Sequence, residues 1–107
     1  MNTERRRYQR VTIPVFYRIP EHSAARRQVQ NLSLGGVRIY SDEDLDIGQT
    51  LELEFFLPNG ITIGAAAKVV WIKKQQPGSE WLYDVGMEFI RLSEVALMEL
   101  DSVLNQD

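Results

Sequence analysis

The feature that most constrains the fold is a pair of alternating apolar runs separated by a short turn signal. Apolar side chains stand at positions 51, 53, 55 and 57, with Glu52 and Glu54 between them, and a second run begins at Ile61. Between the runs lies Pro58-Asn59-Gly60, and an Asn-Gly pair tolerates the positive φ angles of tight turns. Apolar residues at every second position are typical of strands with one buried face. We therefore predict an antiparallel hairpin here.

The same period of two recurs along most of the chain. Strands are predicted over about 11–19, 37–40, 51–57, 61–73 and 81–89, with positions 81, 83, 85, 87 and 89 pointing inward in the last. A further strand is predicted over 26–32, although its two faces are poorly distinguished. Pro14 cannot donate to a sheet, so the first strand should have an unpaired edge or a bulge there. The fifth strand is long, and we expect a bend or bulge near Gly64 or the alanines 65–67.

The C-terminal segment changes to the period of a helix. Ser93 is a plausible N-cap, and the helix is predicted over 93–105. Its apolar face would comprise Ala96, Leu97, Leu100, Val103 and Leu104. We therefore predict an all-β domain with a terminal helix: a small six-stranded antiparallel barrel over 11–90, closed so that no edge is exposed, with the helix covering its open end.

Composition limits the number of domains and the kinds of site. The chain has 107 residues, about 44% of them apolar, which suits one domain over 1–107 with one modest core. It has no cysteine and one histidine, His22, so we expect no disulfide and no metal site. No apolar run approaches the length of a membrane span, and the N-terminus is too polar for a secretory signal, so we expect a cytoplasmic protein.

Charge is distributed unevenly along the chain. The net charge is −3, yet residues 1–27 hold seven arginines against Glu4 and Glu21 and so carry +5, which leaves −8 on the other eighty residues. This division fits an anion-binding arm on an acidic body, and it also fits a solvated basic tail. A nonspecific nucleic-acid binder would more often be basic throughout.

Several kinds of chemistry are disfavoured by the residues present. His22 lies in a polar turn beside Glu21, and no nucleophile, acid and base are suitably spaced, so we expect no enzyme. The acidic segment 42–46 lacks the spacing of a calcium loop. Neither GxxxxGK[ST] nor GxGxxG is present, so any phosphate must be recognised by side chains.

The N-terminal arginines have the chemistry for that recognition. Arg6 and Arg10 lie four positions apart, and a guanidinium can fork onto phosphate oxygens, bind the O6/N7 edge of guanine, or stack on an aromatic face. Lysine would supply charge without the fork or the plane. The alternative for each arginine, and for Arg7 especially, is an ion pair with a carboxylate of the barrel.

Two motifs give the chain a resemblance to a known family. Arg6-Arg7-Tyr8-Gln9-Arg10 fits RxxxR, and Asn31-Leu32-Ser33-Leu34-Gly35-Gly36 fits the (D/N)xSxxG that follows it in the PilZ domain. The chain resembles that family over essentially its whole length, including Trp71 and the late strand segment 84–89 with its Gly-x-x-Phe pattern. The resemblance implies a split-barrel fold and a noncatalytic receptor or adaptor that binds cyclic di-GMP, a bacterial second messenger.

The resemblance also implies roles for individual residues. Arg6 and Arg10 would hold the phosphates and the Hoogsteen edges of the guanines, while Asn31 and Ser33 would contact a base or a phosphate. Gly36 would permit a tight turn and a close approach of the backbone to the ligand. Asn31 replaces the Asp common in the family, which removes a negative charge and keeps an acceptor.

Two further positions extend this expected site. Arg5 directly precedes RxxxR, and in this family an arginine at that position favours two intercalated ligand molecules over one. Trp71 could place an apolar face near a guanine, although a strand tryptophan is more often part of a core. The complete set of expected ligand-binding residues is Arg5, Arg6, Arg10, Asn31, Ser33, Gly36 and Trp71.

These expectations combine into one function with two alternatives. A flexible N-terminal arm, residues 1–10, would be drawn onto the barrel by cyclic di-GMP, and the altered surface would be read by an effector protein whose identity and process the sequence leaves open. The first alternative is a PilZ-like adaptor that acts without ligand. The second is a small-barrel binder of single-stranded nucleic acid, with bases stacked on Phe16, Tyr40 and Phe56.

Overall fold

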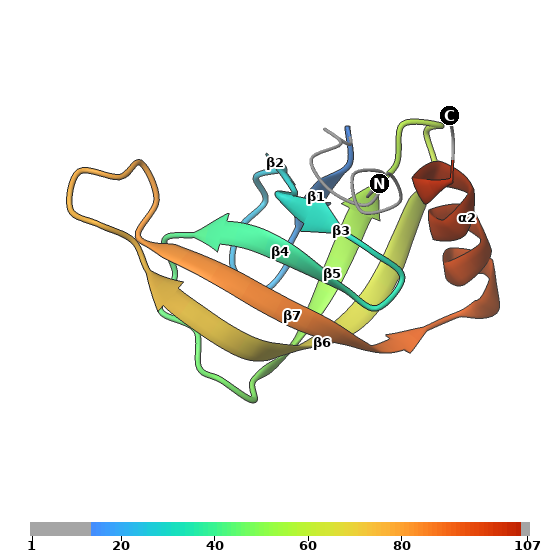
Figure 1. Ribbon diagram of the computed structural model, residues 1–107. Helices are drawn as coiled ribbons and strands as arrows, with labels where there is room; N and C mark the ends of the chain where they lie inside the picture. Colours follow the sequence, from blue (N-terminus) through green and yellow to red (C-terminus); the bar gives the residue numbers. More distant parts are fainter. Residues whose placement is uncertain (1–13, 106–107) are drawn as a thin grey trace, which may run out of the picture.

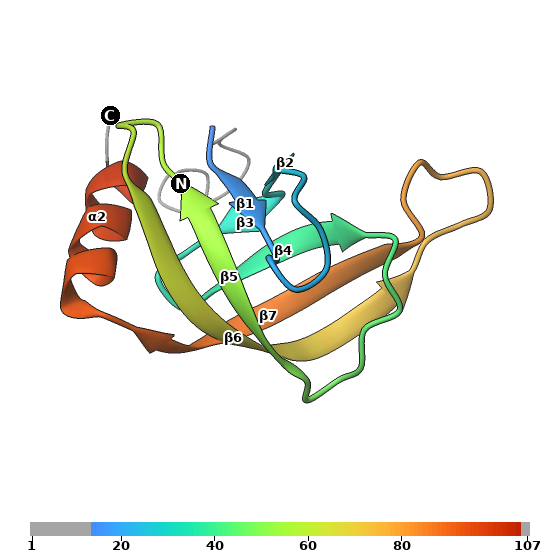
Figure 2. The ribbon, with the colours of Figure 1, turned by 180° about the vertical axis from the view of Figure 1, so that it is seen from behind.

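A computed structural model describes residues 14–105 of the chain. It contains one antiparallel sheet and one helix, and the sheet curls strongly around a core that the helix closes at one end (Figures 1 and 2). The strand order is β2-β1-β5-β6-β7-β4-β3. The elements are β1 (Phe16–Arg18), β2 (Arg27–Gln28), β3 (Asn31–Leu32), β4 (Gly36–Ser41), β5 (Thr50–Phe56), β6 (Thr62–Lys74), β7 (Tyr83–Leu92) and α2 (Glu94–Leu104). The prediction of an all-β domain with a terminal helix is confirmed.

The sheet differs from the predicted six-stranded closed barrel in strand number and closure. It is a half-barrel of seven strands, and the seventh strand arises because the predicted strand 26–32 is divided into β2 and β3. β2 pairs with β1 and β3 pairs with β4, so this segment runs between opposite edges of the sheet. The Val29 N–H donates to the Val15 carbonyl (3.1 Å) and the Gln30 N–H to the Arg38 carbonyl (2.9 Å). One short segment therefore bridges both edges of the curl.

The predicted hairpin around Asn59 is confirmed. β5 and β6 pair antiparallel from Thr50 opposite Lys68 to Phe56 opposite Thr62. At the turn Gly60 has φ +89°, and the Asn59 side-chain oxygen accepts a hydrogen bond from the Ile61 N–H at 3.0 Å. The inward residues of β5, at positions 51, 53 and 55, are buried as the alternation predicts.

The long strand β6 carries two irregularities in its pairing with β7. One lies between Ala66 and Ala67, as predicted, and there β7 has the extra residue, Ile90. The other lies between Val69 and Trp71, where β6 has the extra residue, Val70, and this one was not predicted. Each bulge changes which side chains face the core, and the second sets the position of Trp71 on the sheet.

The helix begins and ends as the sequence indicates. The Ser93 hydroxyl accepts a hydrogen bond from the Ala96 N–H at 3.0 Å, so Ser93 is the N-cap. Three residues of the predicted face are buried and Leu104 is partly buried against the core, but Leu97 is exposed, contrary to the prediction. Asn59 donates to Glu99 at 3.2 Å and so joins the β5–β6 turn to the helix. The buried residues of the helix are Ala96, Leu100 and Val103.

The core lies inside the curl and includes aliphatic and aromatic side chains from β1, β3, β4, β5, β6, β7 and α2. Phe55 is fully buried and meets Phe89 edge to face, with ring centroids 5.8 Å apart. Of the inward positions predicted for the last strand, Val85 and Met87 are buried, whereas Trp81 precedes β7 and is half-buried. Within residues 14–105, no helix has the length and apolar character needed to cross a membrane.

Candidate ligand-binding face of the sheet

The hairpin of β3 and β4 holds three of the expected site residues: Asn31 in β3, Ser33 in the turn and Gly36 in β4. The Ser33 hydroxyl oxygen accepts hydrogen bonds from the N–H groups of Gly35 (3.1 Å) and Gly36 (3.2 Å), and the Ser33 N–H donates to the Gly36 carbonyl at 2.9 Å. Its own O–H lies 3.5 Å from that carbonyl, a long contact. Ser33 therefore organises this turn, a role that was not predicted for it, and Asn31 is exposed beside it.

Gly36 is explained by the packing of two strands. It lies opposite Glu88 in the β4–β7 pairing, and a Cβ added at Gly36 would stand 2.2 Å from the Met87 carbonyl oxygen. No side chain fits at that distance, so the sheet itself requires glycine here. The expected approach of backbone to ligand is not needed to explain this residue.

Four residues form one row across β3, β4, β7 and β6. Asn31 lies opposite Arg38, Arg38 opposite Gly86, and Gly86 opposite Trp71. Residues directly opposite in an antiparallel sheet share a face, and the flanking positions 32, 37, 39, 85 and 87 are buried, so the row lies on the outer face. At about 4.8 Å between strands, Asn31 and Trp71 lie about 14 Å apart along the sheet. The fold thus places two expected site residues on one surface.

The Trp71 indole lies over Gly86. A Cβ added at Gly86 would stand 2.2 Å from Trp71 Nε1, 2.3 Å from Cε2 and 2.7 Å from Cζ2. The space that a side chain would occupy at Gly86 is therefore taken by the indole. Trp71 is 41% exposed, so it lies on the surface of the sheet and one part of the ring system remains accessible. The alternative that Trp71 belongs to the core is not what the structure shows.

An arginine–aspartate pair occupies the middle of this face. Arg38 Nε donates to Asp84 Oδ1 at 2.9 Å, and Arg38 Nη2 donates to Asp84 Oδ2 at 2.7 Å. The hydrogen bonds to Asp84 raise the pKa of the Arg38 guanidinium, which stays charged. The guanidinium carbon also lies 5.9 Å from the centroid of the Tyr40 ring. This pair was not predicted as part of the site.

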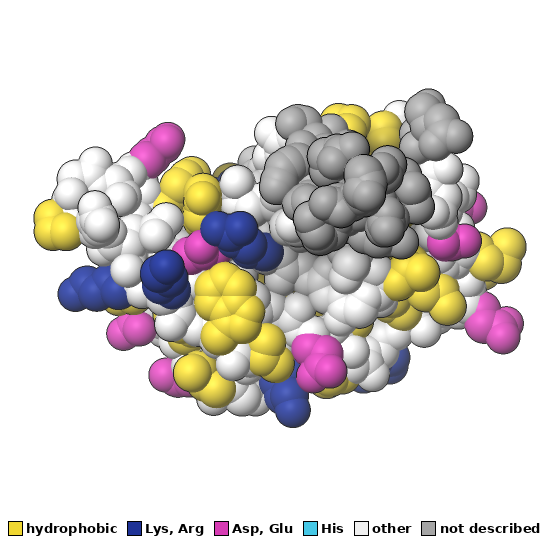
Figure 3. Space-filling model, in the orientation of Figure 1, with side chains coloured by type: hydrophobic (Ala, Val, Ile, Leu, Met, Phe, Trp, Pro, Cys, Tyr) yellow, Lys and Arg dark blue, Asp and Glu magenta, His cyan; other side chains and the backbone are white. Residues whose placement is uncertain are grey.

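The surface around the row mixes three kinds of side chain. Lys73 lies opposite Asp84 and Lys68 opposite Glu88 in the β6–β7 pairing. Figure 3 shows basic, acidic and hydrophobic side chains next to one another over β4 and β7. Such a surface offers flat apolar area together with directed hydrogen-bond donors, which are the contacts that a nucleobase uses.

The arginines of residues 1–27 include some that the structure describes and some that it does not. Arg5, Arg6 and Arg10 lie outside the described residues, so their expected roles stay predictions. Two described arginines lie over aromatic rings: the guanidinium carbon of Arg26 is 3.8 Å from the Phe56 ring centroid, and that of Arg27 is 4.7 Å from the Trp81 ring centroid.

The aromatic residues considered for nucleic-acid stacking do not form one row. Phe16 and Phe56 lie opposite each other on β1 and β5, whereas Tyr40 belongs to β4, three strands from β5 in the sheet order. The Phe56 ring is already covered on one face by Arg26. Tyr40 is therefore separated in the sheet order from the neighbouring Phe16 and Phe56, and the three rings do not form one continuous stacking surface.

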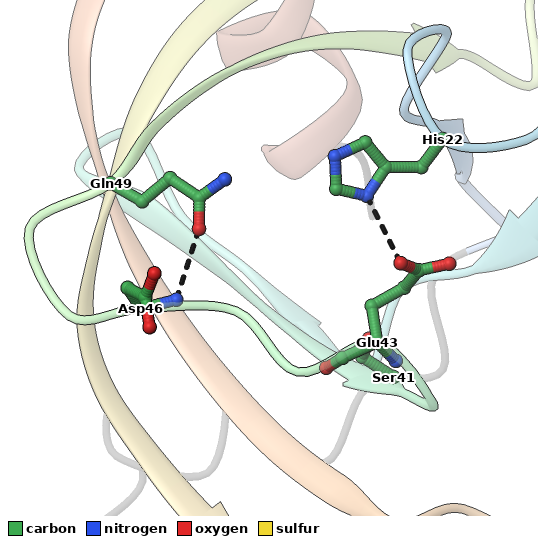
Figure 4. Close-up of polar contacts among 5 residues, drawn as sticks. All are labelled: His22, Ser41, Glu43, Asp46 and Gln49. Carbon is green, nitrogen blue, oxygen red and sulfur yellow. Dashed lines mark hydrogen bonds and ion pairs between the residues drawn. The ribbon is translucent and has the colours of Figure 1, made fainter.

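The acidic loop after β4 is held by its own hydrogen bonds (Figure 4). The Ser41 hydroxyl accepts from the Glu43 N–H at 2.8 Å, the Gln49 side chain accepts from the Asp46 N–H at 2.9 Å, and His22 Nδ1 lies 3.4 Å from Glu43 Oε1. Among residues 14–105, no three His, Asp or Glu side chains are placed to hold a metal ion. The loop thus has the character of a surface connection.

Together these features describe a small curled-sheet domain whose outer face carries a glycine-containing turn, a forked ion pair and an accessible indole. Comparison with protein-family models matches residues 4–106 to the PilZ domain. The chain therefore belongs to the PilZ family, a family of noncatalytic receptor domains that typically bind cyclic di-GMP. A search of curated proteins finds no match.

Asn31 and Trp71 were predicted as site residues from the sequence, whereas Arg38 and Asp84, which lie on the same face, were not. A signal for Arg38 was present, because it alternates with the apolar Val37 and Ile39 and so had to point away from the core. What the alternation could not supply is the register that joins Arg38 to Asp84 across two strands distant in sequence.

Proposed function

We propose that this PilZ domain is a cyclic di-GMP receptor that uses the outer face of β3, β4, β7 and β6 as its ligand surface. The observation that carries the proposal is the row in which Asn31 and Trp71 share one face. Both were expected as ligand contacts from the family motifs, and they come from strands about forty residues apart in sequence.

The remaining contacts would come from the N-terminal motif. Arg6 and Arg10 would bind phosphates or guanine edges, and Arg5 would favour a second, intercalated ligand molecule. Ligand bound to both the motif and the sheet would draw residues 1–10 onto the sheet. Since ordering these residues opposes binding and the contacts are charge-assisted, affinity should fall as salt concentration rises.

The output of such a receptor would be a changed protein surface. We propose that an effector protein, in the cytoplasm, recognises the domain with its ligand and N-terminal segment in place. The family assignment supports this reading because PilZ domains are noncatalytic. The alternative is an adaptor of the same fold that acts without cyclic di-GMP.

Isothermal titration of the full chain with cyclic di-GMP tests the proposal. GMP and a short single-stranded oligonucleotide serve as ligand controls, and Arg6→Ala and Arg10→Ala test the motif. Arg18→Ala is the matched control, because Arg18 is paired with Glu54 on β1 and β5, away from the row.

We expect saturable binding of cyclic di-GMP by the wild type and by Arg18→Ala, and its loss in the two motif variants. A stoichiometry near two per chain would support the role given to Arg5. A folded wild type that binds no cyclic di-GMP would refute the receptor and favour the ligand-independent adaptor. Binding of the oligonucleotide instead would favour the nucleic-acid reading.

A further inference from the structure

The Arg38–Asp84 pair differs from the other arginine pairs of the described residues in its geometry. Arg38 uses two nitrogens on two carboxylate oxygens, whereas Nε and Nη2 of Arg18 both contact Oε1 of Glu54. The side chain of Asp84 is 8% exposed, while that of Arg38 is 43% exposed. The carboxylate is thus the buried half of the pair and the guanidinium the accessible half.

This geometry fixes the orientation of the Arg38 guanidinium and determines which of its N–H groups can bind a ligand. A buried carboxylate needs a partner that satisfies both oxygens, and the two parallel hydrogen bonds hold the guanidinium plane in place. They occupy the Nε–Nη2 edge of the guanidinium. Of its five N–H groups, three are left over, including one on Nη1 and one on Nη2 that form the end-on edge. In the part of the chain that the structure describes, the guanidinium donates to Asp84 alone.

The surroundings of Arg38 match a flat heterocycle. Asn31 lies directly across β3, and Gly86 lies directly across β7 with the Trp71 indole over it. A cyclic dinucleotide lying on this face would therefore meet an amide, a forked donor and an aromatic surface in one row. None of these three groups carries a net charge once Arg38 is counted together with Asp84.

We infer that Arg38 is a specificity-determining residue that reads the O6/N7 edge of a guanine, with Asp84 as its positioning residue. This inference rests on the proposed function and assigns a base contact within the proposed site. The Arg38–Asp84 pair is neutral as a unit, so it attracts a phosphate weakly, but its end-on N–H groups still suit two neighbouring neutral acceptors. Guanine presents two acceptors at O6 and N7, whereas adenine presents a donor at N6.

The test uses a variant and a ligand analogue that remove the same contact. Arg38→Lys keeps a positive charge beside Asp84 and lacks the fork, so the buried carboxylate keeps a partner. The analogue is cyclic di-GMP with 7-deazaguanine bases, in which N7 is replaced by carbon. Affinities of both ligands are measured for the wild type, Arg38→Lys and the matched control Arg18→Lys, with circular dichroism as the check on folding.

We expect Arg38→Lys to lower the affinity for cyclic di-GMP by about 5- to 150-fold, since a bidentate arginine–guanine contact discriminates by roughly 1–3 kcal/mol. The analogue should bind the wild type and Arg18→Lys more weakly than cyclic di-GMP does. The factor between the two ligands should be smaller for Arg38→Lys than for the wild type, because the Arg38 contact to N7 is already gone while any contact from Arg6 or Arg10 remains.

A third variant separates positioning from folding. Asp84→Asn keeps the size of the side chain but provides one acceptor oxygen, so Arg38 loses its fixed plane. We expect Asp84→Asn to lose less affinity for cyclic di-GMP than Arg38→Lys does. We also expect the affinities of cyclic di-GMP and its analogue to differ less in Asp84→Asn than in the wild type. Unfolding of Asp84→Asn would leave the Arg38→Lys comparison as the deciding measurement.

Two results would overturn the inference in distinguishable ways. If the wild type binds cyclic di-GMP and Arg38→Lys binds it equally well, or if the analogue loses the same factor in both proteins, Arg38 does not read the base although the receptor function stands. If the folded wild type binds no cyclic di-GMP, the proposed function and the inference fail together.

Discussion

Replacing Gly36 by alanine should destabilise the domain because two backbones meet there. The added Cβ would lie 2.2 Å from the Met87 carbonyl oxygen and 3.3 Å from Glu88 Cα, and separations under 3.0 Å essentially never occur for real Cβ atoms. β4 and β7 would have to move apart by about 1 Å at this pair. The pairing also extends to Gly35, whose carbonyl accepts from the Phe89 N–H at 2.9 Å, so the movement would strain that hydrogen bond as well.

The magnitude follows from two opposing terms. Overpacking typically destabilises by about 1–3 kcal/mol, and a backbone carbonyl cannot rotate away, so the upper end of that range applies. Alanine also restricts the unfolded chain more than glycine does, and this stabilises the folded state by at most about 1 kcal/mol and offsets part of the loss. The net expectation is a loss of about 2 kcal/mol in the free energy of unfolding, or roughly 8–16 °C in the melting temperature of a domain of this size.

The neighbouring glycine provides the control. A Cβ added at Gly35 would meet nothing nearer than the Ser33 hydroxyl at 3.9 Å, so Gly35→Ala should change stability by less than about 0.5 kcal/mol. The free energy of unfolding of both variants is measured by urea denaturation followed by tryptophan fluorescence. The two values are compared directly if the variants have the same m-value. If Gly36→Ala lost no more stability than Gly35→Ala, the packing explanation of Gly36 would be wrong and a ligand contact would have to explain it.

Two more changes test particular contacts. Ser93→Ala removes the N-cap of α2 and should lower the free energy of unfolding by about 1 kcal/mol. Ser102→Ala, at an exposed helical position, is the control and should lower it by less than about 0.5 kcal/mol. Equal losses of the two variants in urea unfolding would contradict the capping role. Gly86→Ala should displace the Trp71 indole from the sheet and shift its fluorescence emission to longer wavelength. This is measured with Trp81 replaced by phenylalanine, and an unchanged emission would mean that the ring does not lie over residue 86.

Local patterns predicted the elements whose structure depends on neighbouring residues. The Asn59-Gly60 turn, the alternation of β5 and the Ser93 cap each depend on residues within a few positions of one another. The bulge at the alanines was predicted for a similar reason, because a strand of thirteen residues rarely stays regular. These features would be readable in any chain with the same short segments.

Other features depended on pairing between distant segments. Residues 26–32 were predicted as one strand, but β2 and β3 pair with opposite edges of the sheet, and no local pattern says where a strand changes partner. The second bulge, at Val70, was missed for the same reason. Leu97 fits a helical face by spacing, yet the sheet leaves it exposed.

The candidate site shows the same division. The sequence by itself determined the residue types, the RxxxR and NxSxxG motifs and the outward direction of Arg38. Only the tertiary structure decided that Asn31, Arg38, Gly86 and Trp71 share one row and that Arg38 meets Asp84. The physical reason is that side-chain alternation is a local property of each strand, whereas register is set by the packing of all strands around one core.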